Sequence, residues 1–365
     1  GASNFPFAFS VLGGDTASAL AAGCAVLAKG HPAHPRTSAV SAAIVAAAAE
    51  DVLGVAALHL LLGFRAGLDV VGHPAVRAVT LTGSVAAARG ILEVIGRREE
   101  PIPFFGELSS INPLVVLPGA ARRRAGEIAD GLFTSFTGSG GQLCTKPGLA
   151  FVPRTEHGDR IVDGLRSQVE EAPDHVLLSG AIRDAFLGGV ERQVQAGAEH
   201  VAPTRPGRPA SDGFAVRAAL LETEVSRLRP EHAEECFGPV LTVVRYGEVG
   251  EVVDVLRDLA RSLTVSVHAD PDEDRAAVDD VLAVAVERTG RVVFDGYPTG
   301  VRVSWAQHHG GPWPSTNSQH TSVGATAIRR FLRPIAYQNA PEWVLPAELR
   351  DDAEVPRRVD GVLRA

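Results

Sequence analysis

Short apolar runs alternate with Ala-rich helical stretches along residues 1–110 of this chain. The stretch 75–84, AVRAVTLTGS, is rich in β-forming residues and ends in Gly-Ser, and 85–98 then has helical character. The same order occurs earlier, with a strand at 23–30 and a helix at 36–50. Because strand followed by helix is typical of crossover connections, this order predicts a parallel sheet covered by helices and an α/β fold.

A second unit of the same kind follows, and 365 residues suffice for two domains. The expected strands are 112–117, 175–180, 240–246, 263–269 and 291–296, and the expected helices are 121–136, 156–172, 181–197, 247–261 and 271–289. A polar loop is expected at 204–213, and the Pro-rich, charged end is expected to be a surface tail.

The net charge of −8 argues against nucleic acid or an anionic membrane as a partner. The local run Arg122–Arg124 is interpreted as a solvated helix face. The most apolar stretch, 39–64, is interrupted by Glu50 and Asp51 and cannot span a bilayer. We expect it to form a buried, Ala-rich helix followed by a strand or turn.

Three cysteines, Cys24, Cys144 and Cys236, show neither a metal-ligand spacing nor a disulfide framework. This sparse, odd set and the lack of a visible secretory signal predict a cytoplasmic protein without a bound metal. The chain starts at Gly1 and has no methionine. A fragment, a processed chain and lost methionines all remain open as explanations.

Cys144 lies in GSGGQLCTKPG, between three glycines and a Pro-Gly turn. A nucleophilic cysteine needs approach space, a route to the thiolate and a donor for the oxyanion. The glycines before it are expected to let a substrate and a cofactor approach the backbone. Locally, a structural cysteine and a catalytic one are equally good explanations.

Two further polar residues are candidates for acid–base and oxyanion roles. Glu107 lies among apolar residues, where burial would raise its pKa and suit it to general-base work, although a capping carboxylate at a strand end is the commoner case. Asn4, in GASNFPF, can donate its amide to an oxyanion, but a turn residue is again commoner.

Three weaker signals concern a cofactor. Gly83 and Ser84 stand at a strand-to-helix junction that can hold a phosphate, without a complete G-x-G-x-x-G. Lys29 ends a predicted strand and can meet a ribose or phosphate, although a solvated lysine is more common. The segment EECFGPV at 234–240 combines two carboxylates with Cys236 and Phe237, and a strand entry explains it equally.

Taken together and in order, these segments resemble six motifs of the aldehyde dehydrogenase superfamily. They are GASNFPF, GCAVLAKGHP, LTGS, GELSSINP, GGQLCTKPG and EECFGPV. The resemblance implies an aldehyde dehydrogenase-like fold with a Rossmann-like coenzyme domain, and the oxidation of a small-molecule aldehyde with NAD(P). It also implies a homodimer or homotetramer, and it begins at the family's N-F-P segment, so we expect the family's N-terminal part to be lacking.

The resemblance implies a role for each matched catalytic residue. Cys144 would be the nucleophile, and its backbone N–H would form the oxyanion hole together with the Asn4 amide. Glu107 would activate the water that hydrolyses the thioester and help to deprotonate Cys144.

The coenzyme roles follow in the same way. Glu235 would hold the nicotinamide ribose with Phe237 beside the ring, Lys29 would contact the adenosine ribose, and Gly83 with Ser84 would contact the pyrophosphate. The expected domains are 1–107 for coenzyme binding, 108–328 for catalysis and 329–365 for oligomerisation and the tail.

Departures from the family pattern indicate a branch. The segment HHGGPWPSTNSQHTSVG at 308–324 is similar to 2-oxoglutarate-semialdehyde dehydrogenases and to a related NADP-dependent fatty aldehyde dehydrogenase. Pro32 stands where NAD-preferring relatives place a glutamate, so we expect NADP, with NAD possible. His31, His34 and Arg65 are expected near the 2′-phosphate, and Ala88 replaces a family glycine after Gly-Ser.

Overall fold

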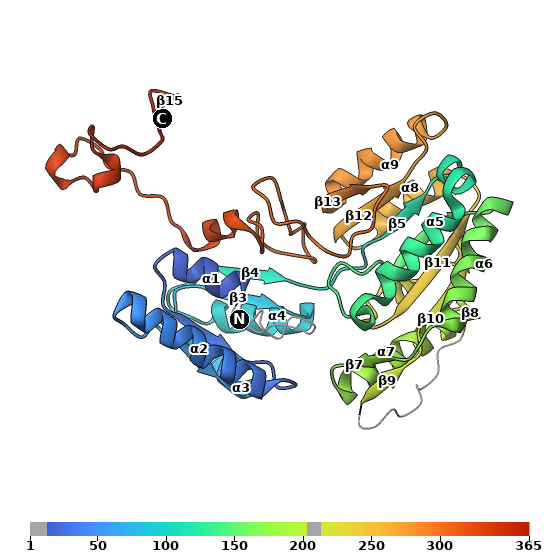
Figure 1. Ribbon diagram of the computed structural model, residues 1–365, viewed down its shortest axis with the longest axis horizontal. Helices are drawn as coiled ribbons and strands as arrows, with labels where there is room; N and C mark the ends of the chain where they lie inside the picture. Colours follow the sequence, from blue (N-terminus) through green and yellow to red (C-terminus); the bar gives the residue numbers. More distant parts are fainter. Residues whose placement is uncertain (1–12, 203–212, 365) are drawn as a thin grey trace. The chain divides into compact units, whose positions relative to one another are not determined.

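The structure is a computed structural model that describes residues 13–202 and 213–364 (Figure 1). The chain divides into two compact units, Gly1–Phe331 and Leu332–Ala365. Among the helices of the described residues, none combines the length and apolar character needed to cross a bilayer.

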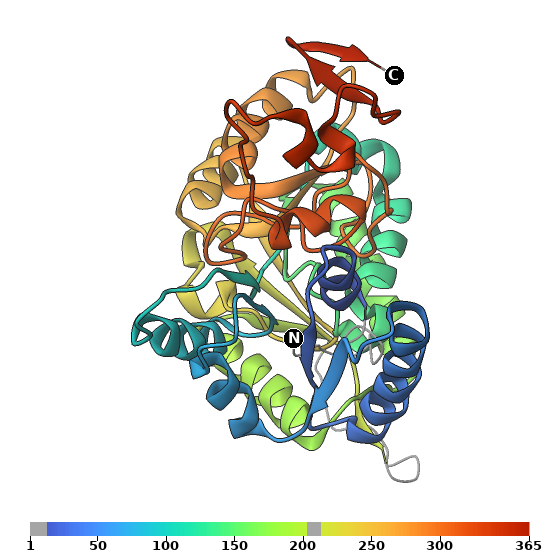
Figure 2. The ribbon, with the colours of Figure 1, turned by 90° about the vertical axis from the view of Figure 1, so that its left-hand side faces the viewer.

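The first part of the larger unit is built on two separate pairs of parallel strands. β1 (Val26–Lys29) pairs with β2 (Leu58–Leu61), and β3 (Val79–Thr82) pairs with β4 (Phe104–Glu107). Figure 2 shows β1 and β2 side by side in blue. The helices between and before them are α1 (Gly14–Ala21), α2 (Pro35–Leu53), α3 (Phe64–Gly72) and α4 (Val85–Gly96).

The sequence of helix α2 explains where the helix begins and ends. Pro35 occupies the first turn, where its missing N–H costs nothing, and the helix ends at Gly54 in the left-handed conformation (φ 70°). The prediction that this helix is buried is wrong, because Val40 and Ile44 are 63% and 65% exposed. A two-stranded pair is too narrow to cover more than one face of the helix.

The second part is a seven-stranded sheet in the order β13-β12-β5-β6-β11-β10-β8. Every neighbouring pair is parallel except β8 with β10. Its strands are β5 (Leu114–Val116), β6 (Leu149–Pro153), β8 (Glu199–Ala202), β10 (Ala219–Glu224), β11 (Val240–Tyr246), β12 (Ser262–His268) and β13 (Thr289–Phe294).

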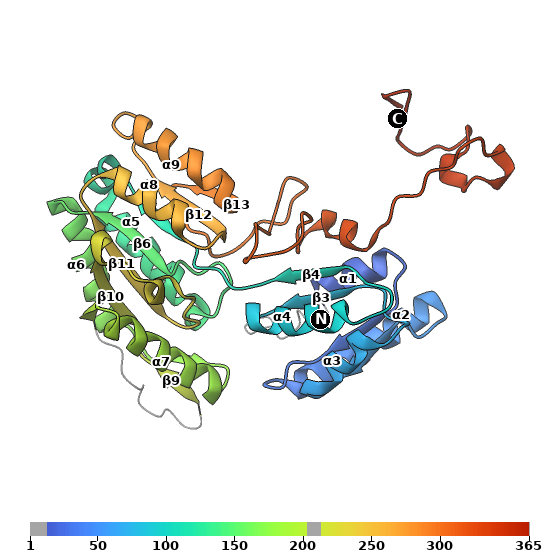
Figure 3. The same cartoon turned by 180° about the vertical axis from the view of Figure 1, so that it is seen from behind.

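Helices cover both faces of this sheet, as the opposite views in Figures 1 and 3 show. On one face lie α5 (Pro118–Thr137) and α6 (Glu156–Glu171), and on the other lie α8 (Val249–Asp258) and α9 (Arg275–Arg288). Buried strands packed on both faces are expected to read as continuous apolar runs. All seven residues of β11 are buried accordingly.

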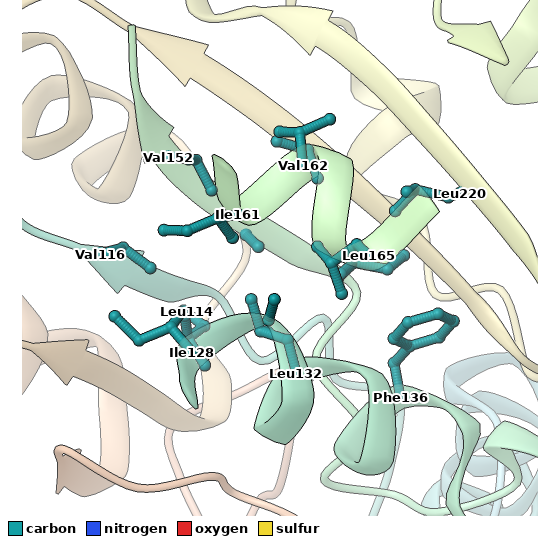
Figure 4. Packing of buried hydrophobic residues seen from close by; sticks show 14 of the residues in the cluster. Leu114, Val116, Ile128, Leu132, Phe136, Val152, Ile161, Val162, Leu165 and Leu220 are labelled. Carbon is teal, nitrogen blue, oxygen red and sulfur yellow. The ribbon is translucent and has the colours of Figure 1, made fainter. Parts of the chain in front are cut away.

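Successive residues of a strand enter different cores because side chains alternate across a sheet. In β5, Leu114 and Val116 pack with α5 and α6, as Figure 4 shows, whereas Val115 packs on the α8 and α9 side. In β6, Val152 and Phe151 divide in the same way. This alternation fixes the register of both central strands.

One predicted strand takes a different partner. The stretch 175–180 contains β7 (His175–Leu177), which pairs antiparallel with β9 (Phe214–Val216) instead of joining the seven-stranded sheet. Helix α7 (Gly180–Gln195) follows it. The predicted loop 204–213 lies outside the described residues except for Gly213.

The helix face with three consecutive arginines is exposed or half-buried, as expected, and each arginine also finds an acidic partner. Arg122 pairs with Glu273, and Arg123 lies 2.7 Å from Asp270. These pairs attach α5 to the segment that precedes α9.

The smaller unit, Leu332–Ala365, contains short 3₁₀ turns and one hairpin. The turns are Glu342–Val344 and Ala347–Leu349, and the hairpin joins β14 (Arg357–Val359) to β15 (Val362–Arg364). Asp360 and Gly361 connect these strands with positive φ values of 50° and 80°, as a tight hairpin requires.

Candidate active site

Two of the sequence motifs meet at the carboxyl ends of neighbouring strands. β3 and β4 are parallel and in register, with Thr82 opposite Glu107. The backbone N–H of Gly83 donates to the carbonyl of Glu107 at 3.0 Å. Because loops at the carboxyl edge of parallel strands bind ligands in α/β proteins, this edge is where a site is expected.

A segment from the end of the larger unit lies along β4. Leu108 N–H donates to the Ser315 carbonyl at 2.8 Å, and the Asn317 side chain bonds both the N–H of Gly106 and the carbonyl of Phe104. This pairing brings the segment 308–324 to Glu107.

Three reactive side chains converge there. His309 Nε2 lies 3.0 Å from Glu107 Oε1 and 3.7 Å from Cys144 Sγ. The hydroxyl of Ser322 donates to the other carboxylate oxygen, Oε2, at 2.5 Å. Glu107 and His309 are buried, whereas Cys144 is half-buried. A thiol and a carboxylate thus lie beside the same ring nitrogen of His309.

The expectation that burial raises the pKa of Glu107 is wrong for this arrangement. Burial does act in that direction, but the charge of His309 and the hydrogen bonds from His309 and Ser322 outweigh it, and the pKa of Glu107 falls to about 2. The sequence could not show this, because both partners come from a segment about two hundred residues away in the chain.

The thiol of Cys144 has the opposite environment. Burial first, and the nearby charge of Glu107 second, raise its pKa well above the ordinary value. This environment favours the protonated thiol over the thiolate.

The loop that carries Cys144 is fixed by Asn112, which the sequence analysis had not singled out as functional. Asn112 is fully buried with a φ of 50°, a conformation that asparagine tolerates. Its amide donates to the carbonyls of Cys144 at 2.9 Å and Lys146 at 3.0 Å. Its carboxamide oxygen accepts from the Thr264 hydroxyl at 3.1 Å, so the loop is tied to β12.

Lys146 joins the same loop to the EECFGPV segment. Its buried ammonium donates to the carbonyl of Val240 at 2.9 Å and interacts electrostatically with Glu235. Burial raises the pKa of Glu235 to about 7, against the lowering effects of the Ser109 hydroxyl and of Lys146. Phe237, two residues further on, is half-buried.

The candidate residues for the adenosine end of a coenzyme lie on the first strand pair. Lys29 ends β1, half-buried, and α3 packs against it, since a Cβ added to Gly67 would lie 3.5 Å from Lys29 Cγ. Arg65 is exposed on the same helix. His31 stacks on His34 with ring centroids 5.2 Å apart.

The environments of these basic side chains differ. Burial first, and then the charges of His34 and Lys29, lower the pKa of His31. His34 is buried against Ser38, with 3.2 Å between Nδ1 and Oγ. Lys29 and Arg65 are two cations that a phosphate could contact.

The remaining candidate residues lie in two places, at the N-terminal end of helix α4 and at the start of the chain. Ser84 is the exposed N-cap of α4, and its hydroxyl accepts from the N–H of Ala87. Ala88, which replaces a family glycine, is fully buried. Asn4 lies outside the described residues, so its oxyanion role stays a prediction.

We expect alkylation of Cys144 by iodoacetamide to be slow at pH 7 and to rise through pH 9 and above, because burial and Glu107 hold the thiol protonated. Peptide mass spectrometry follows Cys144 and the exposed Cys24 in one sample. Free glutathione, with a thiol pKa of about 8.5, gives the reference profile. Alkylation of Cys144 at pH 7 as fast as that of glutathione would contradict the raised pKa.

Comparison with known proteins fits this geometry. The aldehyde dehydrogenase family matches residues 2–333. This chain belongs to the aldehyde dehydrogenase family. Membership in this family supports an oxidoreductase that acts on aldehydes.

Two curated relatives match this chain over almost all of its length. "Alpha-ketoglutaric semialdehyde dehydrogenase 2" of Azospirillum brasilense is 41% identical over 99% of this chain and 70% of its own length. "Alpha-ketoglutaric semialdehyde dehydrogenase" of Acinetobacter baylyi is 36% identical over 100% of this chain and 70% of its own length. The chain thus spans about 70% of the length of these curated relatives.

Solved structures share the fold. A methylmalonate-semialdehyde dehydrogenase described as putative, from Sinorhizobium meliloti and complexed with NAD, superposes with a TM-score of 0.77 at 20% identity, covering 91% of this chain and 67% of that one. Proline utilization A of Bradyrhizobium japonicum gives 0.75 at 26% identity, covering 90% and 33%. The expected aldehyde dehydrogenase-like α/β fold is confirmed.

Proposed function

We propose that this aldehyde dehydrogenase oxidises 2-oxoglutarate semialdehyde to 2-oxoglutarate, with NADP as the preferred coenzyme and NAD as a possible one. The observation that carries the proposal is the cluster of Cys144, His309 and Glu107. The names of the two relatives above support the substrate, and Pro32 supports the coenzyme, because no carboxylate stands there to repel a 2′-phosphate.

The chain offers a fitting place for the coenzyme. Glu235, Lys29 and Arg65 offer a carboxylate for ribose hydroxyls and two cations for phosphate, and the N-terminus of α4 offers backbone N–H groups for a pyrophosphate. When bound, the coenzyme supplies an acceptor for the two electrons and the hydrogen that leave the aldehyde as a hydride.

The first chemical step belongs to Cys144 and the Glu107–His309 pair. The Cys144 thiol is also hydrogen-bonded to the Glu107 carboxylate, so its proton can pass to this pair as Sγ bonds to the aldehyde carbon. His309 Nε2–H donates to Glu107 Oε1 and holds the carboxylate in place. The aldehyde oxygen becomes an oxyanion, for which the resemblance assigns the Cys144 N–H and Asn4.

The second half releases the acid. Loss of the hydride leaves an acyl group on Cys144 as a thioester. A water then attacks this carbonyl, its proton passes to the Glu107–His309 pair, and the C–S bond breaks to return the sulfur. Glu107, with its low pKa, is a weak base by itself, so the pair rather than the carboxylate alone accepts the proton.

A substrate panel and both coenzymes test the proposal. The purified protein should form NADPH with 2-oxoglutarate semialdehyde at a higher kcat/KM than with decanal or benzaldehyde, and NADP should outperform NAD. A preference for long-chain or aromatic aldehydes overturns the substrate, a strong NAD preference overturns the coenzyme, and no turnover at all favours an inactive chain with the family fold.

We infer that Arg291 contributes positive charge for an anionic substrate. This half-buried residue of β13 couples electrostatically to Cys144, and its guanidinium donates to the carbonyls of Pro298 and Gly300. We expect Arg291→Gln to raise KM for 2-oxoglutarate semialdehyde about 10-fold and to leave KM for pentanal unchanged, because only the former carries carboxylate charge. The control is exposed Arg302→Gln, and equal losses for both aldehydes would assign Arg291 a purely structural role.

The pKa of Glu235 makes coenzyme binding depend on pH. The ionised carboxylate accepts hydrogen bonds from ribose hydroxyls, so NADP should bind more tightly as the pH rises from 6 to 8 through the pKa of about 7. Glu235→Gln should weaken binding about 10-fold at pH 8 and flatten the profile. The neighbouring, exposed Glu234→Gln is the control, and a profile that survives in Glu235→Gln would exclude this role.

A further inference from the structure

The cluster of Cys144, His309 and Glu107 also has the composition of a zinc site. Each residue offers one ligand atom, and the three atoms lie within 4.8 Å of one another. Thiolate, imidazole and carboxylate are the ligands that Zn²⁺ takes in proteins. The cysteine spacing considered alone had predicted no metal site, because these residues are far apart in the sequence.

The distances agree with a tetrahedral ion. Bond lengths of about 2.3 Å to sulfur and about 2.0–2.1 Å to nitrogen and oxygen imply edges of about 3.5 Å from sulfur to nitrogen and about 3.3 Å from nitrogen to oxygen. The observed separations are 3.7 Å from Cys144 Sγ to His309 Nε2 and 3.0 Å from that nitrogen to Glu107 Oε1. For these two pairs, adjustments of a few tenths of an ångström suffice, and Sγ and the Glu107 oxygen lie within 4.8 Å of each other.

The surroundings hold two of the ligands in place. The Ser322 hydroxyl bonds Glu107 Oε2, which leaves Oε1 directed at the other two residues. The backbone N–H of His309 donates to the Thr321 hydroxyl at 2.9 Å, and its carbonyl accepts from Ser322. Such partners orient metal ligands in the way that outer-shell hydrogen bonds do in zinc proteins.

We propose that Cys144, His309 and Glu107 bind one Zn²⁺ ion reversibly, and that the bound ion blocks the nucleophile. A bond forms between zinc and Sγ, and the thiol proton passes to the solvent, with no change of oxidation state. The proton on Nε2 moves to Nδ1 through the solvent, zinc takes the Nε2 lone pair and Oε1, and water fills the fourth position. The sulfur is then unavailable to an aldehyde until a chelator removes the ion.

Cobalt is the probe for this site. Co²⁺ added to the reduced, metal-free protein should give a thiolate-to-metal charge-transfer band and the visible absorption of a tetrahedral complex, at about one ion per chain. The band should disappear in Cys144→Ser and remain in Cys24→Ser and Cys236→Ser. His309→Asn and Glu107→Gln should each weaken binding strongly, and Ser322→Ala should weaken it about 10- to 100-fold.

Two outcomes overturn the inference: a band that survives in Cys144→Ser, or binding that is unchanged in His309→Asn. The result is separable from that of the proposed function, because the spectra need no turnover. A protein that binds cobalt at Cys144 but oxidises no aldehyde keeps the metal site and loses the enzyme assignment. An active protein that Zn²⁺ does not inhibit, or that EDTA does not restore after inhibition, keeps the enzyme assignment and loses the metal site.

Discussion

Cys144→Ser is expected to lower kcat for aldehyde oxidation by about a thousand-fold or more, while NADP binding stays within a few-fold of the unmodified protein. A serine hydroxyl is far less acidic than a thiol, so the neighbouring Glu107–His309 pair cannot generate a comparable nucleophile. Steady-state NADPH formation measures the rate, and coenzyme fluorescence titration measures binding. The same titration shows that the variant is folded.

The matched control is Cys24→Ser. Cys24 is exposed after α1, where its backbone N–H bonds the carbonyl of Ala19, and its side chain lies outside the cluster. Its kcat should stay within about two-fold, as for most surface substitutions away from a site. A Cys144→Ser variant as active as Cys24→Ser would remove Cys144 from the mechanism.

The sequence predicted four strands of the seven-stranded sheet, namely β5, β11, β12 and β13. The expected strand 240–246 coincides with β11, and the expected helix 156–172 differs from α6 by one residue. Strands β6, β8 and β10 were not predicted, although every residue of β6 is buried, whereas β2 lies in the stretch for which a strand or turn was expected. The sequence also could not predict that β7 pairs with β9, because strand partners depend on the tertiary fold.

The site was predictable only where a residue stood in a recognisable motif. Cys144 and Glu107 were identified in this way, and the structure brings them together through His309. His309 and Ser322 were not identified, although the segment 308–324 had been noted for departing from the family pattern. Their contact with Glu107 arises from the pairing of that segment with β4, which no local pattern announces.

The structure shows a packing role for a glycine before Cys144 that the sequence analysis did not expect. Ser139, Gly140 and Gly141 all have positive φ, between 53° and 66°. The Gly141 Cα faces the backbone of the EECFGPV segment, because a Cβ there would lie 2.2 Å from the carbonyl carbon and oxygen of Gly238. At this position, close packing of two protein segments requires glycine.

Gly141→Ala is therefore expected to destabilise the protein by about 3 kcal/mol or more and to abolish turnover. The new methyl group overlaps backbone atoms, which cannot move aside by a rotamer change, and the left-handed conformation adds about 1 kcal/mol. Separation of the two segments would also displace Lys146 from Val240 and carry Cys144 away from His309. Urea unfolding and NADPH formation measure the two effects.

Gly138→Ala in the same loop is the control that makes this result specific. Its φ is −51°, and an added Cβ meets only the Leu143 side chain, at 3.9 Å. This variant should unfold within about 0.5 kcal/mol of the original protein and keep its activity. Equal losses in both variants would mean that the loop needs glycine for approach of the substrate, as the sequence first indicated. A loss confined to Gly141→Ala would mean that contact with Gly238 positions the nucleophile.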